Sequence, residues 1–460
     1  MRQGLYILLA CTVLLSGCGL YTKYERPADI QTENLFRDIP DNGEDLISLA
    51  DLSWDQFFTD PQLQAYIAEG LANNTDLQNA LLTVEQAEAI LLPAKLAFFP
   101  SLALAPQGTI SSFDGGKASF NYQLPAVASW QLDLFGGLLN AKRGAKASLL
   151  QSQAYRQAVQ ARVVTGIATC YYSLLMLHAQ FVIASETATK WQENVATMKA
   201  MKEAAMTNEA GVAQSEAAYY QVLLSIPELR RSIREVENTL NLLLGRAPEE
   251  IVRGRDITAQ QLPTEITVGL PAKILARRPD VQAAEYSLMS AYYGTKQAQA
   301  AFYPGITLSG TAAFTNNAGG ITFNPAKFVA SAVGSLTQPI FMNGALRAQS
   351  KIAKASQEQA KNNFEQTLLN AGTEVSNALF QYQTALEKQA IRSMQVESTR
   401  RAAEFTKYLF TFPAGNNTSY LEVLNAEQTL LQARLAEVSD HFERLTALIT
   451  LYQAVGGGTN

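Results

Sequence analysis

Thiols and imidazoles are the side chains that most directly support catalysis or metal binding, and this chain of 460 residues has three cysteines and two histidines. His178 and His441 stand outside any CxxC or HExxH spacing, so the sequence gives metal catalysis no support. The chain also lacks a GxSxG nucleophile motif and a P-loop. We therefore expect no enzymatic activity and no resident cofactor. The cysteines remain, and their side chains could be chemically modified.

Cys18 has the surroundings expected of a lipidated cysteine. Arg2 precedes an apolar run from Leu5 to Leu15, which is too short to span a bilayer as a mature helix and is typical of an export signal. The run ends in "LSGC", which resembles a bacterial lipobox. We expect residues 1–17 to be removed and the Cys18 thiol to carry lipid. A coincidental cysteine after an ordinary signal is the alternative, and Gly19, rather than Asp, favours the outer membrane.

The other cysteines and the composition narrow the class of protein further. Cys11 would be removed with the signal peptide, which leaves Cys170 as the one cysteine without an expected modification, so no disulfide is expected in the mature chain. We expect Cys170 to behave as a small buried apolar residue. With 47% hydrophobic and 17% charged residues the chain is in the globular range. A net charge of −5 without a basic patch argues against nucleic-acid binding.

The chain contains one large internal repeat. The stretch "AFFPSLAL" from Ala97 returns as "AFYPGITL" from Ala301, 204 residues later. Because a single repeat of this length is far longer than a solenoid unit, it indicates two copies of one large structural unit.

Each repeat contains a predicted β-hairpin. Residues 102–110 and 119–134 alternate between apolar and polar, as do 306–314 and 328–337, with turn-forming residues between the members of each pair. Strands of about ten residues with one apolar face are typical of a transmembrane β-barrel wall. Two soluble hairpins packed on a core are the alternative.

Long helices follow the hairpins. Helical patterns run from about Leu138 to Thr207 and from about Ala345 to Thr411, and each would measure about 100 Å. Both end near a glycine, Gly211 or Gly415, after which a shorter helix returns. The returning helices carry heptad seams, typical of coiled coils. The seams are Val222, Ile226, Leu229, Ile233, Val236, Leu240 and Leu243, and Leu431, Leu435, Val438, Phe442, Leu445, Ile449 and Tyr452.

Two features qualify this helical pattern. Pro227 lies inside the first returning helix and is expected to kink it. The stretch from Val163 to Ala184 contains no charged residue and is long enough for a membrane-spanning helix. Polar residues dilute that stretch, and its counterpart in the second repeat contains Glu374, so we favour a helix buried among other helices.

Four strands cannot close a barrel, and an open sheet edge in lipid would leave backbone groups unpaired. The chain is therefore expected to oligomerise, and a trimer would supply twelve strands around an open interior.

The chain resembles the TolC-like outer-membrane factor family, in particular the NodT-like lipoprotein branch that serves RND-type efflux systems. The resemblance covers nearly the whole length. The sequence motifs that support the resemblance, besides the lipobox and the repeated stretch, are "YERP", "SWDQFFTDPQL", "WQLDLFG", "NLLLG", "LARRPDVQAAE", "QPIFMNGALRAQ", "AGNNTSYLEVLNAEQTLL" and "LYQAVGGG".

The resemblance implies a mixed α/β membrane protein in which a 12-stranded trimeric β-barrel is continued by a periplasmic α-helical coiled-coil barrel with a mixed equatorial belt. The expected division is residues 1–17 signal peptide, 18–75 N-terminal equatorial segment, 76–245 first repeat, 246–280 equatorial linker, 281–456 second repeat and 457–460 tail. The belt would draw on 54–63, 246–279 and the C-terminus.

The resemblance also implies a passive homotrimeric exit duct in outer-membrane lipid, which carries drugs or metal ions from an inner-membrane RND-type pump through a periplasmic adaptor. The tips near Gly211, Gly415 and Tyr420 would face the adaptor, although both glycines could be mere turn residues. A duct for secreted protein or polysaccharide is an alternative, and a lipid-anchored coiled-coil spacer without a pore is another.

The periplasmic gate of this family commonly has Asp at the position of Asn425 and Arg at that of Gln428, a pair able to form charge-assisted bonds. This chain has neither charge, so we predict a gate that depends less on ion pairs. Glu422, Glu427 and, one repeat earlier, Glu216 remain, and the sequence leaves open whether they line the constriction or solvate helix faces.

Arg277 and Arg278 in "RRPD" could suggest a binding site. We favour a structural role, because Pro279 and Asp280 are suited to begin a helix, with the acid at its positive end.

Overall fold

The computed structural model describes residues 18–30, 49, 52–112, 114–260, 262, 277–316, 328–412 and 419–459. The expected signal peptide and Gly415 lie outside these residues. The elements are η1 (Cys18–Leu20), α2 (Trp54–Phe57), α3 (Pro61–Asn73), α4 (Thr75–Leu96), β1 (Ser101–Leu104), β2 (Gln107–Ser111), β3 (Ser119–Leu132), α5 (Gly137–Glu203), α6 (Glu209–Leu244), η3 (Ile257–Ala259), α8 (Pro279–Ala300), β4 (Gly305–Asn316), β5 (Phe328–Thr337), α9 (Ala345–Thr411) and α10 (Tyr420–Ala454).

The chain divides into two compact units, and each takes residues from both sequence repeats. The sheet unit is drawn from Met1–Gln31, Leu82–Ala154 and Gln282–Thr367. The helical unit is drawn from Thr32–Leu81, Tyr155–Val281 and Leu368–Asn460. The predicted long helices are confirmed as α5 and α9, of 67 residues each, and both contribute to the two units.

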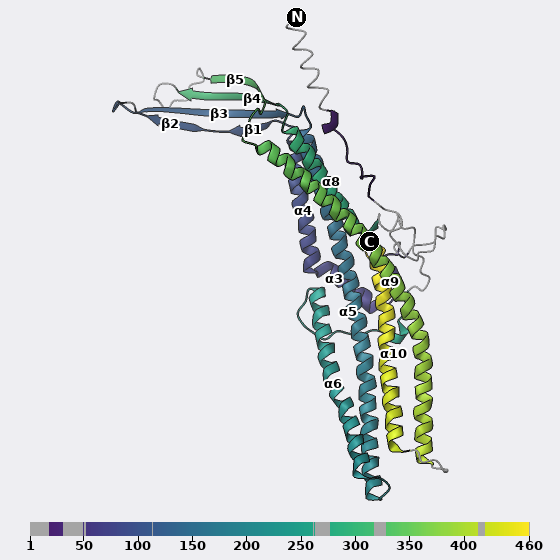
Figure 1. Ribbon diagram of the computed structural model, residues 1–460. Helices are drawn as coiled ribbons and strands as arrows, with labels where there is room; N and C mark the ends of the chain where they lie inside the picture. Colours follow the sequence, from purple (N-terminus) through teal and green to yellow (C-terminus); the bar gives the residue numbers. More distant parts are fainter. Residues whose placement is uncertain are drawn as a thin grey trace. The chain divides into compact units, whose positions relative to one another are not determined.

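The sheet unit holds one antiparallel sheet in the order β1-β3-β4-β5, with β2 also paired to β3 (Figure 1). The two predicted hairpins therefore join through β3 and β4, in a register that places Trp130 opposite Leu308. Every residue of β1, β2 and β5 is exposed, so no other described residue covers either face of these strands. Strands with both faces open need surroundings that the described part of the chain does not provide.

The first predicted strand is interrupted, which the alternation pattern did not show. β1 ends at Leu104 and β2 begins at Gln107, opposite the part of β3 that contains Pro125. Ala105 lies opposite Pro125, and its N–H donates to the Pro125 carbonyl at 3.0 Å. Pro125 has no backbone N–H to form the second hydrogen bond of this pair, so one ladder bond is missing where β1 and β2 separate. The described sheet thus has five strands rather than the expected four.

The helical unit repeats one anchoring contact at corresponding places of the two repeats. Asn74, between α3 and α4, accepts from the Leu77 N–H and donates to the Leu243 carbonyl at 2.9 Å, near the end of α6. Arg278, which lies 204 residues later, donates to the Ala454 carbonyl at 2.9 Å, at the end of α10. Each returning helix is therefore tied to the residue that precedes α4 or α8.

Glycines make the same two junctions possible. Gly245 has φ +73° and Gly456 has φ +93°. A Cβ at Gly245 would lie 2.6 Å from the Asn73 carbonyl oxygen, and one at Gly456 would lie 3.3 Å from that of Arg277. Both positions combine a left-handed backbone with a close approach, which favours glycine.

The core of the helical unit joins the N-terminal segment, α5, α6 and α10. Phe57 stacks on Tyr452 with ring centroids 4.0 Å apart, and Phe57, Tyr171 and Tyr172 are fully buried. Every residue of the two predicted heptad seams is buried or half-buried, so the seams do face inward. α6 continues through Pro227 without a break in its assignment.

By length and composition α5 could cross a membrane, and it is the one such helix among the described residues. A core helix passes the same test, and Val164, Ile167 and Ala168 pack in the buried core of the helical unit. Their burial favours the predicted role of a helix among helices. Cys170, half-buried against this core, has its thiol pKa raised by burial.

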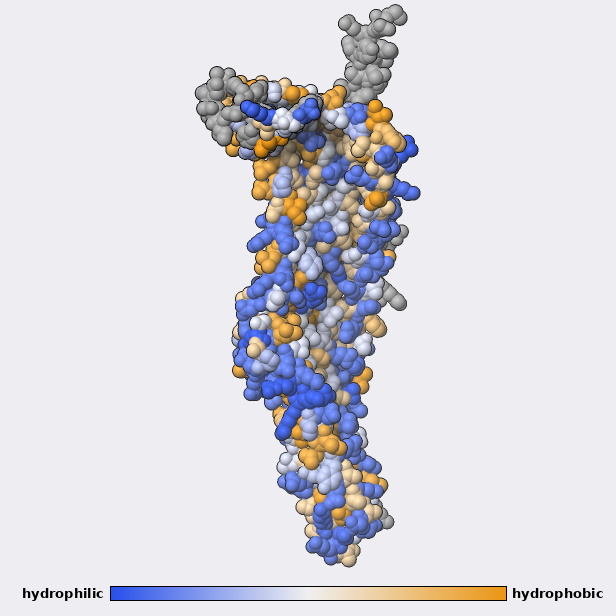
Figure 2. All heavy atoms as spheres, turned by 90° about the vertical axis from the view of Figure 1, so that its left-hand side faces the viewer, coloured by the Kyte–Doolittle hydropathy of each residue, from blue (hydrophilic) through white to orange (hydrophobic). Residues whose placement is uncertain are grey.

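Apolar side chains also reach the surface of the chain. Figure 2 shows them as orange patches among blue polar ones on one face of the molecule. In the sheet unit they include Leu102, Leu104 and Ile110, which are 73% to 81% exposed. Exposed aliphatic side chains at this density on a two-faced sheet indicate a surface that contacts lipid or another chain.

Candidate functional site

Cys18, the predicted lipid carrier, begins η1 in the sheet unit. The residues that follow it are held in place: Lys296 Nζ donates to the Gly19 carbonyl at 2.9 Å, and Leu20 is buried. Tyr21 Oη donates to the Leu134 carbonyl at 2.7 Å, just beyond the end of β3. The stretch that begins with η1 is therefore held close to the end of β3.

Asn425 and Gln428, the two predicted gate residues that lack charge, lie one turn apart on α10. They line a groove of about 590 Å³ that also takes in Trp191 from α5 and Gln221 and Ser225 from α6. All five polar or aromatic groups are neutral. Any attraction across this groove is therefore by amide and hydroxyl hydrogen bonds, as expected from the missing Asp and Arg.

The side chain of Glu427 contacts α5 and does not line the groove formed by Asn425 and Gln428. Its Oε2 accepts from Asn194 Nδ2 of α5 at 3.0 Å. Burial raises the pKa of Glu427, while Lys407, the bonds to Asn194 and Trp191, and Lys190 lower it, and the raised direction prevails. Glu427 thus belongs to the α5–α10 contact, and the structure does not bring it together with Asn425 and Gln428 in the groove.

The other two candidate carboxylates are surface groups. Glu422 is exposed on the first turn of α10, where a carboxylate is favoured by the positive end of the helix dipole. Glu216 on α6 forms an ion pair with Lys199 of α5 at 2.7 Å. The pair joins the two arms of the first helical hairpin close to its tip. The structure therefore shows a helix-pairing contact for Glu216 and a solvated position for Glu422.

Gly211, a candidate for the adaptor-facing tip with a turn residue as the alternative, lies within the first turn of α6 and not in the turn before it. Asn208 caps this helix and accepts from the Gly211 N–H at 3.1 Å, and the turn itself contains Ala205 with φ +58°. A Cβ on Gly211 would meet Thr207 Oγ1 at 2.9 Å and Met198 Cε at 3.1 Å, so the glycine permits close packing of the tip.

Tyr420 begins α10 at the second tip. Its ring lies 5.7 Å from that of Phe410 on α9. Burial raises the pKa of Tyr420, which a hydrogen bond with Ser215 of α6 partly offsets. Tyr420 therefore links the second hairpin to the first, a contact that the sequence did not predict.

A network of charges between α9 and α10 also escaped prediction. Arg392 Nε donates to Asp440 Oδ2 at 2.7 Å, and Lys388 pairs with Glu443. Asp440 is buried, although it lies two residues from both Val438 and Phe442 and therefore on the opposite side of α10 from the heptad seam. The heptad pattern gave no signal for this pair.

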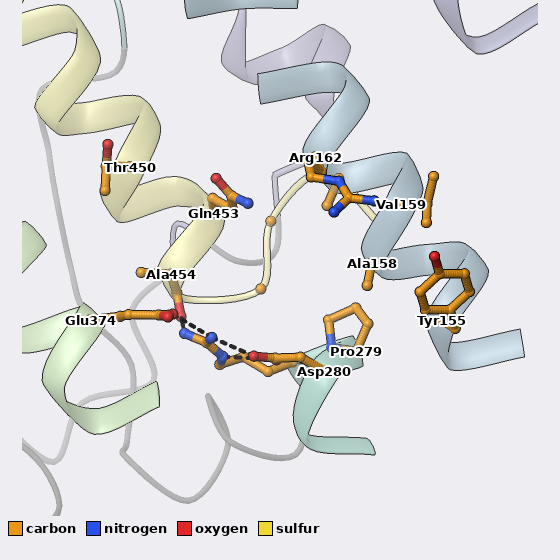
Figure 3. A pocket seen from close by; sticks show the side chains of 14 residues that line it. Tyr155, Ala158, Val159, Arg162, Pro279, Asp280, Glu374, Thr450, Gln453 and Ala454 are labelled. Atoms are coloured by element: carbon orange, nitrogen blue, oxygen red, sulfur yellow. Dashed lines mark hydrogen bonds and ion pairs between the residues drawn. The ribbon is translucent and has the colours of Figure 1, made fainter. Parts of the chain in front are cut away.

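Arg278 is the centre of a second cluster in the helical unit, which confirms the structural role predicted for it. The guanidinium, only 5% exposed, binds Asp280 through two bonds of 3.0 and 2.6 Å and Glu374 at 2.5 Å, in addition to the Ala454 carbonyl (Figure 3). As predicted, α8 begins at Pro279 with Asp280 in its first turn. The adjoining hollow of about 370 Å³ is also lined by Arg162.

Asp60 forms a third cluster, within the segment predicted to join the equatorial belt. It is buried and accepts from the Gln62 N–H at 2.9 Å, Tyr171 Oη at 3.0 Å and Gln260 Nε2 at 2.7 Å. Burial alone would raise the pKa of Asp60, but these bonds outweigh it and hold the pKa below the usual value. The cluster joins the start of α3, α5 and the segment around η3, so parts of the predicted belt do pack together.

Known proteins share this arrangement. The chain is 29% identical over 459 residues to the "Cation efflux system protein CusC" of Escherichia coli K12, covering 97% of this chain and 98% of that one. It is 27% identical to the "Probable outer membrane lipoprotein SilC" of Salmonella typhimurium, covering 97% and 96%. The crystal structure of the open state of the MtrE outer membrane channel of Neisseria gonorrhoeae superposes with a TM-score of 0.85 at 26% identity, covering 95% and 98%.

A family model gives the assignment. The model described as "Outer membrane efflux protein" matches residues 66–246 and 270–457, two stretches that follow the two repeats of the sequence. Together they cover most of the chain and include the sheet, the long helices and the candidate gate residues. The chain therefore belongs to the outer membrane efflux protein family and works as an outer-membrane channel for efflux.

Proposed function

We propose that three copies of this chain form a passive exit duct that carries drugs or metal ions, received from an inner-membrane RND-type pump through a periplasmic adaptor. The observation that carries the proposal is the sheet: β5 and the β1–β2 strand are edges among the described residues, and both faces are open. Because open edges are costly in lipid, closure requires strands from other copies. Three copies supply enough for a barrel with an open interior.

Helix α9 supports the assembly independently. Its buried face includes Ala371, Val375 and Ala378. On the opposite face lies an apolar stripe, continued by Phe412 just after the helix, whose members are 54% to 68% exposed: Leu369, Phe380, Ile391, Met394, Phe405, Tyr408 and Phe412. The spacing of these residues by 3, 4 and 11 keeps them on one side of the helix. We assign this stripe to contact with a neighbouring copy.

The first experiment measures the mass of the detergent-extracted protein together with its single-channel conductance in planar bilayers. A trimer with rare, small openings supports a gated duct, whereas a monomer without conductance leaves the lipid-anchored spacer. Ile391→Asp and Phe405→Asp are expected to abolish the trimer, because each buries a charge in the stripe. Asn377→Asp, at an exposed polar position on the same helix, is the matched control and should leave the trimer intact.

We further propose that the gate is held by neutral groups. Asn425 and Gln428 line a groove without charged residues, so separate changes to Ala are expected to raise the resting conductance by less than about tenfold. Raising the ionic strength should alter it little, because there is no ion pair in the groove to screen. A tenfold rise in either variant, or a strong dependence on salt, contradicts the neutral gate.

The remaining assignments belong to the same proposal. Cys18 carries the lipid, which mass spectrometry of the mature N-terminal peptide tests. The tips near Gly211, Gly415 and Tyr420 face the adaptor. A photo-crosslinker placed at Asn208, which caps α6, should capture the adaptor in cells, whereas one placed at Glu25 in the sheet unit should not.

A further inference from the structure

The stretch after Cys18 lies in a binding site formed by α5 and α8. It contains no strand, yet its backbone carbonyls are bound in succession by side chains of these two helices. Lys296 donates to Gly19, Asn140 to Leu20 at 2.9 Å, and Arg143 to Tyr21 at 3.1 Å and Thr22 at 3.4 Å. Tyr292 Oη lies 3.5 Å from the next carbonyl, that of Lys23. Because these donors bind successive backbone carbonyls, they hold η1 and the residues after it at a fixed register.

The same stretch makes further contacts through the side chains of Thr22 and Arg26 and the backbone N–H of Tyr24. Thr22 Oγ1 and Tyr292 Oη lie 2.7 Å apart, and the Tyr24 N–H donates to Tyr293 Oη at 3.2 Å. Arg26 binds Glu285 of α8 through two bonds, of 2.9 and 2.6 Å.

The stretch also reaches α9. The guanidinium of Arg26 lies 5.6 Å from the ring centroid of Phe364, and Asp29 pairs with Lys361. Leu20 and Ile30, near the two ends, are buried. The stretch therefore joins one long helix from each repeat and α8, all within the sheet unit.

We propose that Cys18–Ile30 is a docked strap, a second anchor that acts independently of the lipid and delivers the acyl chains of Cys18 into the membrane beside the end of β3. The interaction surface is the α5–α8 binding site, and its occupant is this chain's own N-terminus. The contacts described above are made by residues 19–29, which carry no lipid, so we expect docking to persist without it. The proposal rests on the lipidation of Cys18 only for the position of the acyl chains.

Docking of the strap is measured with the full chain in bacterial outer membranes. Tyr21 is replaced by the photo-crosslinking residue p-benzoylphenylalanine, and the yield of crosslinks to the peptide that contains Leu134 to Asn140 is quantified by mass spectrometry. An unlipidated form carries a non-lipoprotein signal in place of residues 1–17 together with Cys18→Ser. The crosslink yield of the unlipidated form is expected to lie within twofold of the parent.

The binding site is tested with the double variant Arg143→Ala and Lys296→Ala. We expect at least a fivefold lower crosslink yield, with palmitate labelling of Cys18 unchanged. Lys146→Ala is the matched control, because Lys146 lies one turn from Arg143 on α5 and is exposed. It should retain the yield of the parent.

A charge exchange separates docking from folding. Arg26→Glu should lower the crosslink yield, Lys23→Glu at an exposed neighbouring position should not, and adding Glu285→Arg to Arg26→Glu should restore at least half of it. Loss of the crosslink in the unlipidated form, or its retention in the double variant, overturns the proposal. Because the yield is read without measuring transport, the strap and the duct can fail separately.

Discussion

Replacing Arg278 tests whether one side chain ties α10 to the start of α8. Arg278→Met keeps most of the buried volume but removes the bonds to Ala454, Asp280 and Glu374. The two carboxylates are 44% and 57% exposed and can be hydrated again, so losing both ion pairs costs only about 1 kcal/mol. The Ala454 carbonyl loses its side-chain donor, which costs about 1–3 kcal/mol.

The expected loss for Arg278→Met is therefore about 2–4 kcal/mol in the free energy of unfolding, below the 3–5 kcal/mol of a fully buried pair. Urea unfolding followed by tryptophan fluorescence measures it, at one protein concentration because assembly contributes to stability. Glu374→Gln is the matched control and should cost less than about 1 kcal/mol. The reasoning is refuted if Arg278→Met unfolds like the parent, or if Glu374→Gln costs as much as Arg278→Met.

Three further changes have defined outcomes in the same unfolding assay. Gly245→Ala should destabilise by about 1–3 kcal/mol, because it combines a left-handed backbone with a clash against Asn73, whereas Gly294→Ala, in open space on α8, should not destabilise. Asp60→Asn should cost about 2–4 kcal/mol at neutral pH, since an amide cannot accept from all three donors. Because the pKa of Asp60 is lowered on folding, its contribution is present above about pH 4 and is lost as the pH falls through the folded-state pKa; Asp60→Asn should remove this acid dependence. The raised pKa of Glu427 acts in the opposite sense: stability falls as the pH rises from about 4.3 to the folded-state pKa, and Glu427→Gln should abolish that fall without loss at neutral pH. A steeper pH dependence in Glu427→Gln would show that another group is responsible.

The regular elements of this chain could be predicted from the sequence because each leaves a period. Heptad seams predicted α6 and α10, alternation predicted β3 to β5, and the Pro-Asp pair predicted the start of α8. The break between β1 and β2 could not be predicted from alternation, because it depends on where Pro125 of β3 lies against the first strand. The position of a proline in the sequence predicts such a break only when the pairing register of the two strands is known.

The candidate site was less accessible to prediction. The sequence showed that Asn425 and Gln428 are neutral, but the direction in which Glu427 points depends on the rotation of α10 against α5. The clusters around Asp60 and Arg278 combine residues separated by up to 200 positions, from segments without periodicity. The strap is bound through its carbonyls, which every residue has, so residue types there give little indication of docking.

The pairing of β3 with β4 has a consequence for biogenesis. Tyr122 pairs with Asn316 and Leu132 with Ile306, so the partners are separated by 174 to 194 residues. Contacts this distant in sequence form slowly. During export from the N-terminus, the first hairpin reaches the periplasm before β4 does. Until β4 arrives, the backbone groups of β3 that will bind β4 are unpaired and could pair with a strand of another protein. A newly exported chain therefore depends on something to shield that edge until its second half arrives, and on meeting further copies soon afterwards.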